Sequence, residues 1–282
     1  MGRILIVGCG YLGRETAGLF HNAGWHVEGW VMSVESTREL SAQAYRVSAV
    51  DISNAEQVSS AGGTFDAVIH CASTRGGDPD LYRRVYLTGA NNLIDRFAGS
   101  RILFTSSTSV YAQTNGQWVN EDGPAEPRHE TGKILRETEQ LVLDHGGLVA
   151  RLAGIYGPGR SFLLRKFLSN KAMVDPTSDR FVNQIHRDDA AAALFLLLDQ
   201  AAPGGIYNVV DDQPILQSEC YRWLAEKLDR PLLAGGTLTR KLKRGESNKR
   251  VSNAKLRALG WRPRYSFFAE AMEKSVLSSF SS

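Results

Sequence analysis

Cysteine is scarce in this chain of 282 residues, and its few thiols are far apart. Only Cys9, Cys71 and Cys220 are present. An odd number at wide spacing provides neither a disulfide framework nor a set of metal ligands, and it is typical of a reducing compartment. We therefore expect no bound metal, and we interpret Cys9 and Cys71 as small buried residues.

Long apolar runs and a strong net charge are also missing. The longest apolar run, Ala190–Leu198, is too short to cross a bilayer. Met1 leads within two residues into an apolar segment, so no signal peptide is expected. The formal net charge of +3 is too small to indicate nucleic acid. These absences predict a cytoplasmic protein that binds neither membranes nor nucleic acid.

One stretch departs from this even charge balance. Thr239–Arg257 contains eight Lys or Arg residues and a single acid, Glu246. Such a run is either a solvated surface or a clamp for an anionic substrate. The sequence leaves both interpretations open.

The most informative segment is Arg3–Phe20. Four apolar residues, Ile4–Val7, precede the glycines of a GxGxxG pattern, and a helical pattern follows at once. This order predicts a buried strand, a tight turn and the start of a helix. Glycine lets the backbone approach a pyrophosphate, and the helix start offers free N–H groups and a partial positive charge. The segment therefore predicts a dinucleotide site formed by Gly8, Gly10, Tyr11, Leu12 and Gly13.

Strand and helix patterns then alternate along the chain. We predict strands at 26–32, 45–52, 65–72, 101–105 and 147–152, and helices at 11–23, 80–98 and 130–144. Alternation of this kind predicts parallel strands joined by right-handed crossovers, which is a Rossmann-type, doubly wound α/β fold. Ligands bind at the carboxyl ends of such strands, where the sequence places Gly8, Ser33, Asp51, Ala72 and Ser106.

The pattern loosens after about Gly157, where prolines punctuate short segments. We expect an NAD(P)-binding Rossmann domain over residues 1–157 and a smaller C-terminal substrate lobe over 158–282. Segments at about 181–212 are expected to return to the Rossmann sheet.

Five later segments carry a family resemblance. They read FTSSTSVYA (104–112), RLAGIYGPG (151–159), VNQIHRDDAAAAL (182–194), GGIYNVVDD (204–212) and NAKLRALGWRP (253–263). With the glycine turn, and in this order, they resemble the extended short-chain dehydrogenase/reductases, the NAD(P)-dependent epimerases and dehydratases of sugar nucleotides. The resemblance covers nearly the whole chain. It implies an epimerase/dehydratase-type oxidoreductase that acts on a nucleotide-sugar or a similar small polar substrate.

The chain departs from that family at the catalytic helix. The family carries Tyr-x-x-x-Lys followed by an acidic-Gln pair, and anchoring on Glu139-Gln140 places Thr131 at the tyrosine position and Leu135 at the lysine position. Tyrosine has a pKa of about 10 that an ammonium can lower, whereas a threonine alcohol is a far weaker acid. The chain therefore resembles an atypical branch of the superfamily that lacks the Tyr-x-x-x-Lys pair.

A shifted pair is an alternative. His129 and Lys133 have the spacing of one helix face. However, Lys133 lies about 200° around the helix from Leu135, which belongs to the apolar stripe. We therefore expect Lys133 to face solvent.

Ser107 stands four residues before Tyr111, where the resemblance implies a catalytic Ser or Thr that bonds the substrate oxygen. The alternative is a hydroxyl that only satisfies the strand end. We take Ser107 and Thr131 as the candidate catalytic residues. Tyr111 and Tyr156 are interpreted as structural, and His186 as the cap or anchor of its helix.

The second strand bears on the choice of cofactor. An NAD-preferring site carries an acid at the end of this strand, where this chain has Val31, Met32 and Ser33, while Glu28 lies at mid-strand. Hydroxyls and a guanidinium near this end could bind a 2′-phosphate, in Ser33, Ser36, Thr37 and Arg38. We therefore predict NADP(H) in preference to NAD(H).

The resemblance implies the other cofactor contacts. Asp51 and Ile52 would flank the adenine, and Gly154 and Ile155 would border the nicotinamide. The strand ends would supply the remaining contacts, from Cys71, Ala72, Ser73, Thr105 and Ser106.

Partners follow from the same resemblance. The family holds diphospho-sugars with basic groups, for which the candidates are Lys249, Arg250, Arg160 and Arg165, with plain surface charge as the alternative for each. Helices near 82–97 and 130–143 correspond to those of a family homodimer. A second function stays open, that of a catalytically silent NADP(H)-binding sensor or scaffold.

Overall fold

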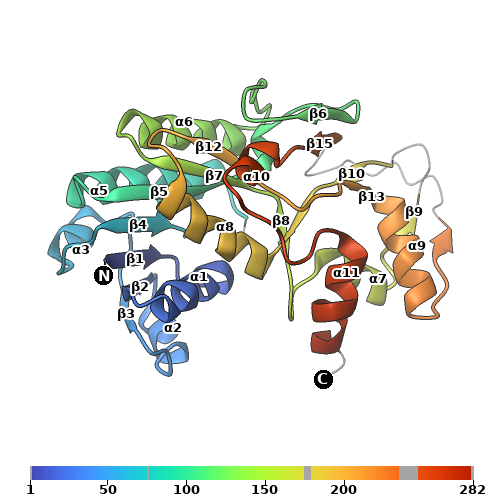
Figure 1. Ribbon diagram of the computed structural model, residues 1–282, viewed down its shortest axis with the longest axis horizontal. Coiled ribbons are helices and arrows are strands. Elements are labelled where there is room, and N and C mark those ends of the chain that lie inside the picture. The colour runs from blue at the N-terminus through green and yellow to red at the C-terminus, as the bar shows by residue number, and fades with distance from the viewer. Residues whose placement is uncertain (1, 75, 175–178, 235–246, 281–282) are drawn as a thin grey trace.

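A seven-stranded parallel sheet forms the centre of the molecule (Figure 1). The computed structural model describes residues 2–74, 76–174, 179–234 and 247–280. In sheet order the strands are β12 (Ile206–Val209), β7 (Leu148–Leu152), β5 (Arg101–Ser107), β4 (Ala67–His70), β1 (Arg3–Val7), β2 (His26–Val31) and β3 (Arg46–Ala49). Every pairing in this sheet is parallel, which confirms the doubly wound Rossmann-type fold.

Helices cover both faces of the sheet (Figure 1). One face carries α1 (Tyr11–Asn22) packed against α8 (Arg187–Gln200), and α2 (Val34–Glu39) lies beside β3. The other carries α3 (Ala55–Ser60), α4 (Pro79–Tyr82), the π-helical turn η1 (Arg83–Thr88), α5 (Gly89–Arg96) and α6 (Glu130–Asp144). The predicted helix at 130–144 is therefore confirmed, and the one predicted at 80–98 is a continuous path through α4, η1 and α5.

Local chemistry sets where these elements begin and end. The side chains of Ile4–Val7 in β1 are almost fully buried, as four consecutive apolar residues in a central parallel strand require. The third strand is shorter than predicted because Asp51 starts a turn, in which its Oδ1 accepts a hydrogen bond of 2.9 Å from the Ser53 amide. Asp78 caps α4 by accepting from the Leu81 amide at 2.8 Å.

The sheet order reverses between β1 and β4. From β1 the chain proceeds to β2 and β3 on one side, and then returns to β4, β5, β7 and β12 on the other. In open α/β sheets such a reversal leaves a crevice at the carboxyl ends of the strands, and ligands bind there. The glycine turn that follows β1 lies at this point.

Short ribbons and helices make up the C-terminal part. The ribbons pair β8 (Gly154–Tyr156) with β11 (Gln184–His186), β10 (Phe181–Val182) with β13 (Ile215–Leu216), β6 (Gln117–Val119) with β15 (Lys249–Val251), and β9 (Met173–Val174) with β14 (Leu233–Ala234). The helices are α7 (Phe162–Leu168), α9 (Gln217–Lys227), α10 (Ala254–Ala258) and α11 (Phe268–Ala271), followed by the turns η3 (Met272–Val276) and η4 (Leu277–Phe280). A short 3-10 turn, η2 (Thr108–Val110), follows β5.

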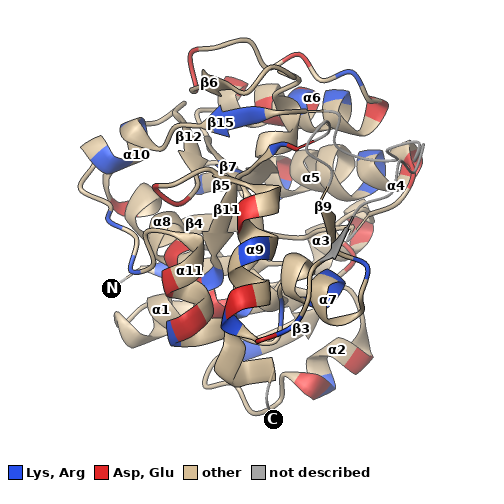
Figure 2. Cartoon of the chain, turned by 90° about the vertical axis from the view of Figure 1, so that its right-hand side faces the viewer, with Lys and Arg blue, Asp and Glu red and all other residues tan. Residues whose placement is uncertain are grey.

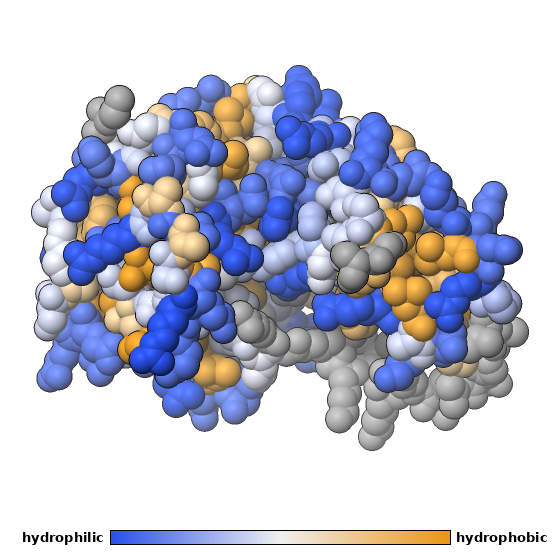
Figure 3. All heavy atoms as spheres, turned by 90° about the horizontal axis from the view of Figure 1, so that it is seen from below, coloured by the Kyte–Doolittle hydropathy of each residue, from blue (hydrophilic) through white to orange (hydrophobic). Residues whose placement is uncertain are grey.

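The buried apolar residues form two separate clusters. The larger one lies around the sheet, and the smaller one includes Tyr156, Leu164, Cys220, Phe268 and Met272. From below, the outline of the molecule is indented along one side (Figure 3). Two cores fit a Rossmann domain with a smaller lobe, and the boundary at 157/158 stays a prediction.

Charged residues of both signs are interspersed on the side that Figure 2 shows. Blue and red segments alternate on α9 and α6 in the view of Figure 2. Among the described helices, none has the length and apolarity that a membrane crossing needs. Of the basic stretch 239–257, residues 239–246 lie outside the described part of the chain.

Candidate functional site

The glycine turn is fixed by two close contacts. Gly8 has φ +82°, and a Cβ there would lie 2.3 Å from the amide nitrogen of Ala72, at the end of β4. A Cβ on Gly13 would lie 2.3 Å from the carbonyl oxygen of Gly8. Both positions therefore exclude any side chain, because the turn is clamped between β4 and α1.

Gly10 has more free space around it than Gly8 and Gly13. A Cβ on Gly10 would have only the Gly8 carbonyl oxygen within 4.0 Å among the described residues. The protein itself therefore leaves open the space that a side chain would fill. In a GxGxxG turn the second glycine is the one that lets a pyrophosphate approach the backbone.

The start of α1 faces this open space. Gly10 is its N-cap, no side chain of the described residues caps it, and its first turn contains no acid in that part of the chain. A twelve-residue helix with neither a side-chain cap nor an acid in its first turn presents free N–H groups and a partial positive charge at its start. Tyr11 is half-buried beside it, and Leu12 is buried beneath.

The carboxyl end of β2 is polar and open. Met32 is 74% exposed, and Ser33 caps α2 by accepting from the Ser36 amide at 3.3 Å. Arg38 is exposed on α2. Sequence reasoning missed one acid here, Glu35, which is exposed in the first turn of α2.

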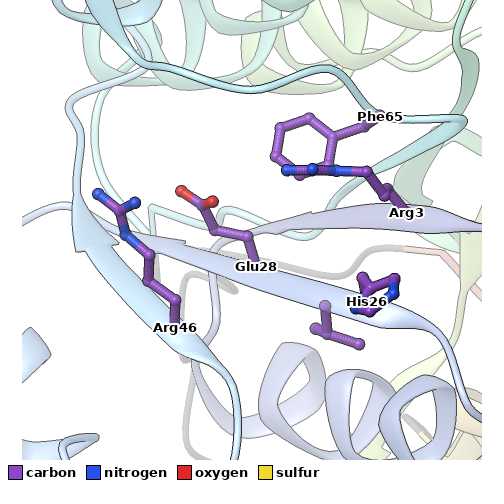
Figure 4. A pocket seen from close by; sticks show the side chains of 6 residues that line it. Arg3, His26, Glu28, Arg46 and Phe65 are labelled. Carbon is purple, nitrogen blue, oxygen red and sulfur yellow. The ribbon is translucent and has the colours of Figure 1, made fainter.

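Glu28 lies away from this end of β2. Its carboxylate accepts hydrogen bonds from Trp30 Nε1 at 3.1 Å and Ser48 Oγ at 3.4 Å. It lines a hollow of about 320 Å³ with Arg3, His26, Arg46 and Phe65 (Figure 4). These residues lie toward the amino ends of β1, β2 and β3, away from the glycine turn. Glu28 therefore cannot be the acid that contacts a ribose in this fold.

Asp51 and Ile52 follow β3. The Oδ1 of Asp51 also accepts from Ser53 Oγ at 2.8 Å, so one face of the carboxylate is fixed. Ile52 is buried, and its carbonyl oxygen accepts from Asn92 Nδ2 at 2.8 Å. The pair is held in place, while its predicted adenine contact stays a prediction.

The ends of β4 and β5 lie beside the glycine turn. The Cys71 amide donates to the Val7 carbonyl at 2.7 Å, and burial raises the pKa of the Cys71 thiol to about 12. Ser73 Oγ accepts from Tyr86 Oη at 3.4 Å. Thr105 Oγ1 donates to the His70 carbonyl at 2.9 Å, so its hydroxyl spans β5 and β4. The residues predicted at these strand ends are therefore brought together.

Ser107 ends β5 half-buried, and its oxygen accepts from the Ser109 amide at 3.1 Å. This bond caps η2 and leaves the hydroxyl hydrogen without an acceptor among the described residues. Thr131 is half-buried in the first turn of α6, and the structure gives its hydroxyl no hydrogen bond to any residue that it describes. Both hydroxyls are thus available to a ligand.

The shifted pair is not formed. Lys133 is 60% exposed at its side chain and pairs with Glu130 at 3.5 Å, and His129 is exposed as well. Leu135, one turn after Thr131, is buried. The expectation that Lys133 faces solvent is confirmed.

The predicted nicotinamide edge lies at β8. Gly154 is exposed, and its amide donates to the Asn183 carbonyl at 3.1 Å, while Ile155 is half-buried. His186 is fully buried and accepts from the Asp188 amide at 3.2 Å, which confirms it as the cap of α8. Burial lowers the pKa of His186 to about 4, so its ring is neutral near pH 7.

Comparison with known proteins decides the family. The profile of the NAD-dependent epimerase/dehydratase family matches residues 4–210. The curated Escherichia coli (strain K12) protein YeeZ is 31% identical over 225 residues, which span 74% of this chain and 77% of YeeZ. This chain belongs to the NAD-dependent epimerase/dehydratase family.

Solved structures agree with this assignment. A Methylobacillus flagellatus protein described as a candidate NAD-dependent epimerase/dehydratase is 27% identical, with a TM-score of 0.79 over 100% of this chain and 99% of its own. The UDP-glucose 4-epimerase of Thermus thermophilus, solved with NAD, has a TM-score of 0.84 at 21% identity and covers 99% of each chain. At that identity the second comparison shows the fold alone.

A buried ionic network that the sequence analysis did not predict lies behind the candidate site. Glu139 on α6 and Arg151 on β7 are both buried and form a bidentate pair at 2.8 and 3.1 Å. Arg136 bonds the same carboxylate from the outside, and Ser106 Oγ donates to it at 2.5 Å. The hydroxyl of Ser106 therefore points into the core, while that of Ser107 does not share this bond. An acid four residues after Leu135, on the stripe that faces inward, was the available signal.

The network continues through a buried tyrosine. Arg151 Nη1 donates to Tyr111 Oη at 2.8 Å, and Tyr111 Oη donates to Asn208 Oδ1 at 2.9 Å. This bonding agrees with the interpretation of Tyr111 as structural. Through these bonds α6 and three strands, β5, β7 and β12, are joined around the turn that carries Ser107.

Lys249 is buried, which rules out the alternative that it is plain surface charge. Its side chain is buried, with the residue 5% exposed, and Nζ donates to the Tyr111 carbonyl at 2.9 Å and to Ser247 Oγ at 3.0 Å. Burial, with a smaller effect of Arg180, lowers the pKa of Lys249 to about 8. Arg250 lies over the rings of Trp118 and Phe181, at 5.3 and 4.9 Å. Arg160 and Arg165 are exposed.

Proposed function

We propose that this chain is an NADP(H)-dependent oxidoreductase of the epimerase/dehydratase type, acting on a nucleotide-sugar or a similar small polar substrate. One observation carries the cofactor part of the proposal. Gly8 and Gly13 are closed by protein atoms, whereas Gly10 opens onto free space at the start of α1, in the crevice between β1 and β4. A dinucleotide pyrophosphate fits this combination of an open backbone and an uncapped helix.

Two hydroxyls define the proposed chemistry. The oxygen of Ser107 already accepts from the Ser109 amide, so its hydrogen is directed to another acceptor, which we assign to a substrate hydroxyl or carbonyl oxygen. Thr131 offers a second hydroxyl, and Leu135 offers no ammonium to lower its pKa. The proton is therefore expected to pass through water that Thr131 holds in place. A nicotinamide bound at this edge would supply hydride acceptance and donation.

The preference for NADP(H) rests on the end of β2. The carboxylate of Glu28 lies at mid-strand and is bonded to Trp30 and Ser48, and Arg38 is exposed with Ser33 and Ser36 nearby. A guanidinium forms charge-assisted hydrogen bonds with a 2′-phosphate that NADH lacks. Glu35 in the same turn opposes this preference.

Calorimetry tests the choice of cofactor. We expect NADPH to bind more tightly than NADH, and Arg38→Ala to weaken NADPH by about tenfold. NADH is the internal control, and its affinity should change by less than about twofold in the variant. Equal affinity for the two dinucleotides, or tighter NADH binding, would overturn the preference.

Turnover tests Ser107. In a screen of nucleotide-sugars with reduced and oxidised cofactor, Ser107→Ala is expected to lower turnover by about a hundredfold or more, because a positioned donor is lost at the reacting oxygen. Ser109→Ala is the matched control, since Ser109 is exposed on the same turn. Unchanged turnover in Ser107→Ala would exclude the proposed role.

A silent sensor or scaffold is the second candidate function. Thr131 and Leu135 favour it, since they stand in place of the tyrosine and of the lysine that lowers the tyrosine pKa in the resembling enzymes. Tight NADPH binding with no turnover across the screen would support this second function.

A homodimer through the outer helices is also proposed. Arg83 on η1 pairs with Glu137 on α6 at 3.1 Å, so η1 and α6 lie side by side as one helical surface. Two such surfaces from two copies would form a four-helix contact of the kind that the resemblance implies. Sedimentation equilibrium measures the mass directly, and a monomer at all concentrations would contradict the proposal.

A further inference from the structure

Backbone hydrogen bonds close the turn that follows β8. The Gly157 amide donates to the Arg160 carbonyl at 2.8 Å, and the Arg160 amide donates back to the Gly157 carbonyl at 3.0 Å. The Gly159 amide also donates to Ser279 Oγ at 2.8 Å, near the end of the described chain. The backbone of Arg160 is therefore held at both sides of the turn.

This turn lies on Tyr11, the first residue of α1. Tyr11 Oη donates to the Pro158 carbonyl at 3.0 Å. A Cβ on Gly157 would lie 2.6 Å from Tyr11 Oη, so the backbone approaches the tyrosine more closely than a side chain would allow. In Figure 1 the loop after β8 descends on the side of the molecule where α1 begins. The turn and the start of α1 are thus in direct contact.

Two guanidinium groups lie over the Tyr11 ring, and they differ in whether an acid neutralises their charge. The Cζ atoms of Arg160 and Arg187 each lie 5.1 Å from the ring centroid. Arg187 pairs with Glu15 at 3.0 Å and with Asp188 at 2.8 Å. Arg160 forms no ion pair with any residue in the described ranges, and it is exposed. The charge of Arg187 is therefore neutralised by acids of the protein, whereas that of Arg160 is not.

We propose that Arg160 binds the pyrophosphate of the dinucleotide, with its guanidinium held by the Tyr11 ring at the start of α1. This inference rests on the proposed function, because it requires a dinucleotide in the crevice. An arginine stacked on an aromatic ring keeps its planar donors in one orientation, which suits two neighbouring phosphate oxygens. The Gly8, Cys9 and Gly10 amides already donate to protein carbonyls, so the backbone amides at the start of α1 would contact the pyrophosphate together with Arg160.

Calorimetry with two probes tests the inference. The probes are NADPH and adenosine 2′-monophosphate, which lacks the pyrophosphate. Arg160→Ala is expected to weaken NADPH by about tenfold and to leave the monophosphate within about twofold of wild type. Arg160→Lys should recover part of the loss, since it keeps the charge but not the planar fork. Arg230→Ala, which removes an exposed arginine on the loop after α9, should change neither affinity.

Two results would overturn it. The first is NADPH affinity in Arg160→Ala within about twofold of wild type. The second is an equal loss for both probes, which would mean that the variant disturbs the whole site. Far-ultraviolet circular dichroism checks that each variant is folded. Wild-type protein that binds no dinucleotide would instead contradict the proposed function, and the inference with it, so the two failures are distinguishable.

Discussion

Gly10→Ala is expected to abolish most dinucleotide binding while leaving the fold intact. A Cβ on Gly10 meets only the Gly8 carbonyl oxygen, at 4.0 Å, among the described atoms, so the folded chain accommodates it. The same Cβ would occupy the space into which a pyrophosphate must enter to reach the backbone amides. We expect NADPH affinity to fall by about thirtyfold or more, with the free energy of unfolding changed by less than about 1 kcal/mol.

Two matched glycines control this result. Gly18 lies on α1, and a Cβ there meets nothing within 4 Å in the described chain, so Gly18→Ala should change neither binding nor stability adversely. Gly13→Ala should destabilise the protein, because its Cβ would lie 2.3 Å from the Gly8 carbonyl oxygen. Calorimetry and urea unfolding measure the two properties separately. Normal NADPH affinity in a folded Gly10→Ala variant would place the pyrophosphate elsewhere.

Arg151→Met is expected to lower the free energy of unfolding by about 3–5 kcal/mol. Arg151 and Glu139 are almost fully inaccessible, at 1% and 0% of their side-chain surface. Removing the guanidinium leaves the Glu139 carboxylate buried with only part of the positive charge that balances it. Tyr111 Oη also loses the hydrogen bond from Arg151 Nη1. An uncompensated buried charge is among the costliest changes that a single substitution can make.

Arg136→Met is the matched control. Arg136 bonds the same carboxylate, but its side chain is 31% exposed, so water can replace it. We expect a loss of about 1 kcal/mol or less. Adding Glu139→Leu to Arg151→Met should recover part of the stability, because it removes the stranded charge. Equal losses for the two arginine variants in urea unfolding would contradict this account.

Much of the fold could be predicted from the sequence because its signals are local. The run Ile4–Val7 followed by glycines predicts a central strand and a tight turn, and the apolar stripe at about 130–144 predicts α6. Such patterns depend on neighbours one to four positions away. The third strand was predicted too long, since the Asp51 side chain accepts from the Ser53 amide and starts a turn there.

The candidate site could be predicted only in part. Ser107, Thr131 and the glycine turn could be proposed because each occupies a position set by a motif, and their roles stay predictions. The burial of Lys249 was missed, because a basic residue in a basic stretch gives no local sign of the pocket that encloses it. Glu35 was missed as well, although its position two residues after Ser33 made it visible in the sequence.

By itself the sequence determined the parallel sheet, the open turn at Gly10 and the loss of the Tyr-x-x-x-Lys pair. Tertiary structure alone decided which distant side chains meet. Arg151 reaches Tyr111 across 40 positions, and Tyr11 reaches Pro158 across 147. These contacts depend on the order of strands in the sheet and on the return of the chain to its first helix. No local pattern encodes that order, because a periodic segment specifies which face is buried but not which partner buries it.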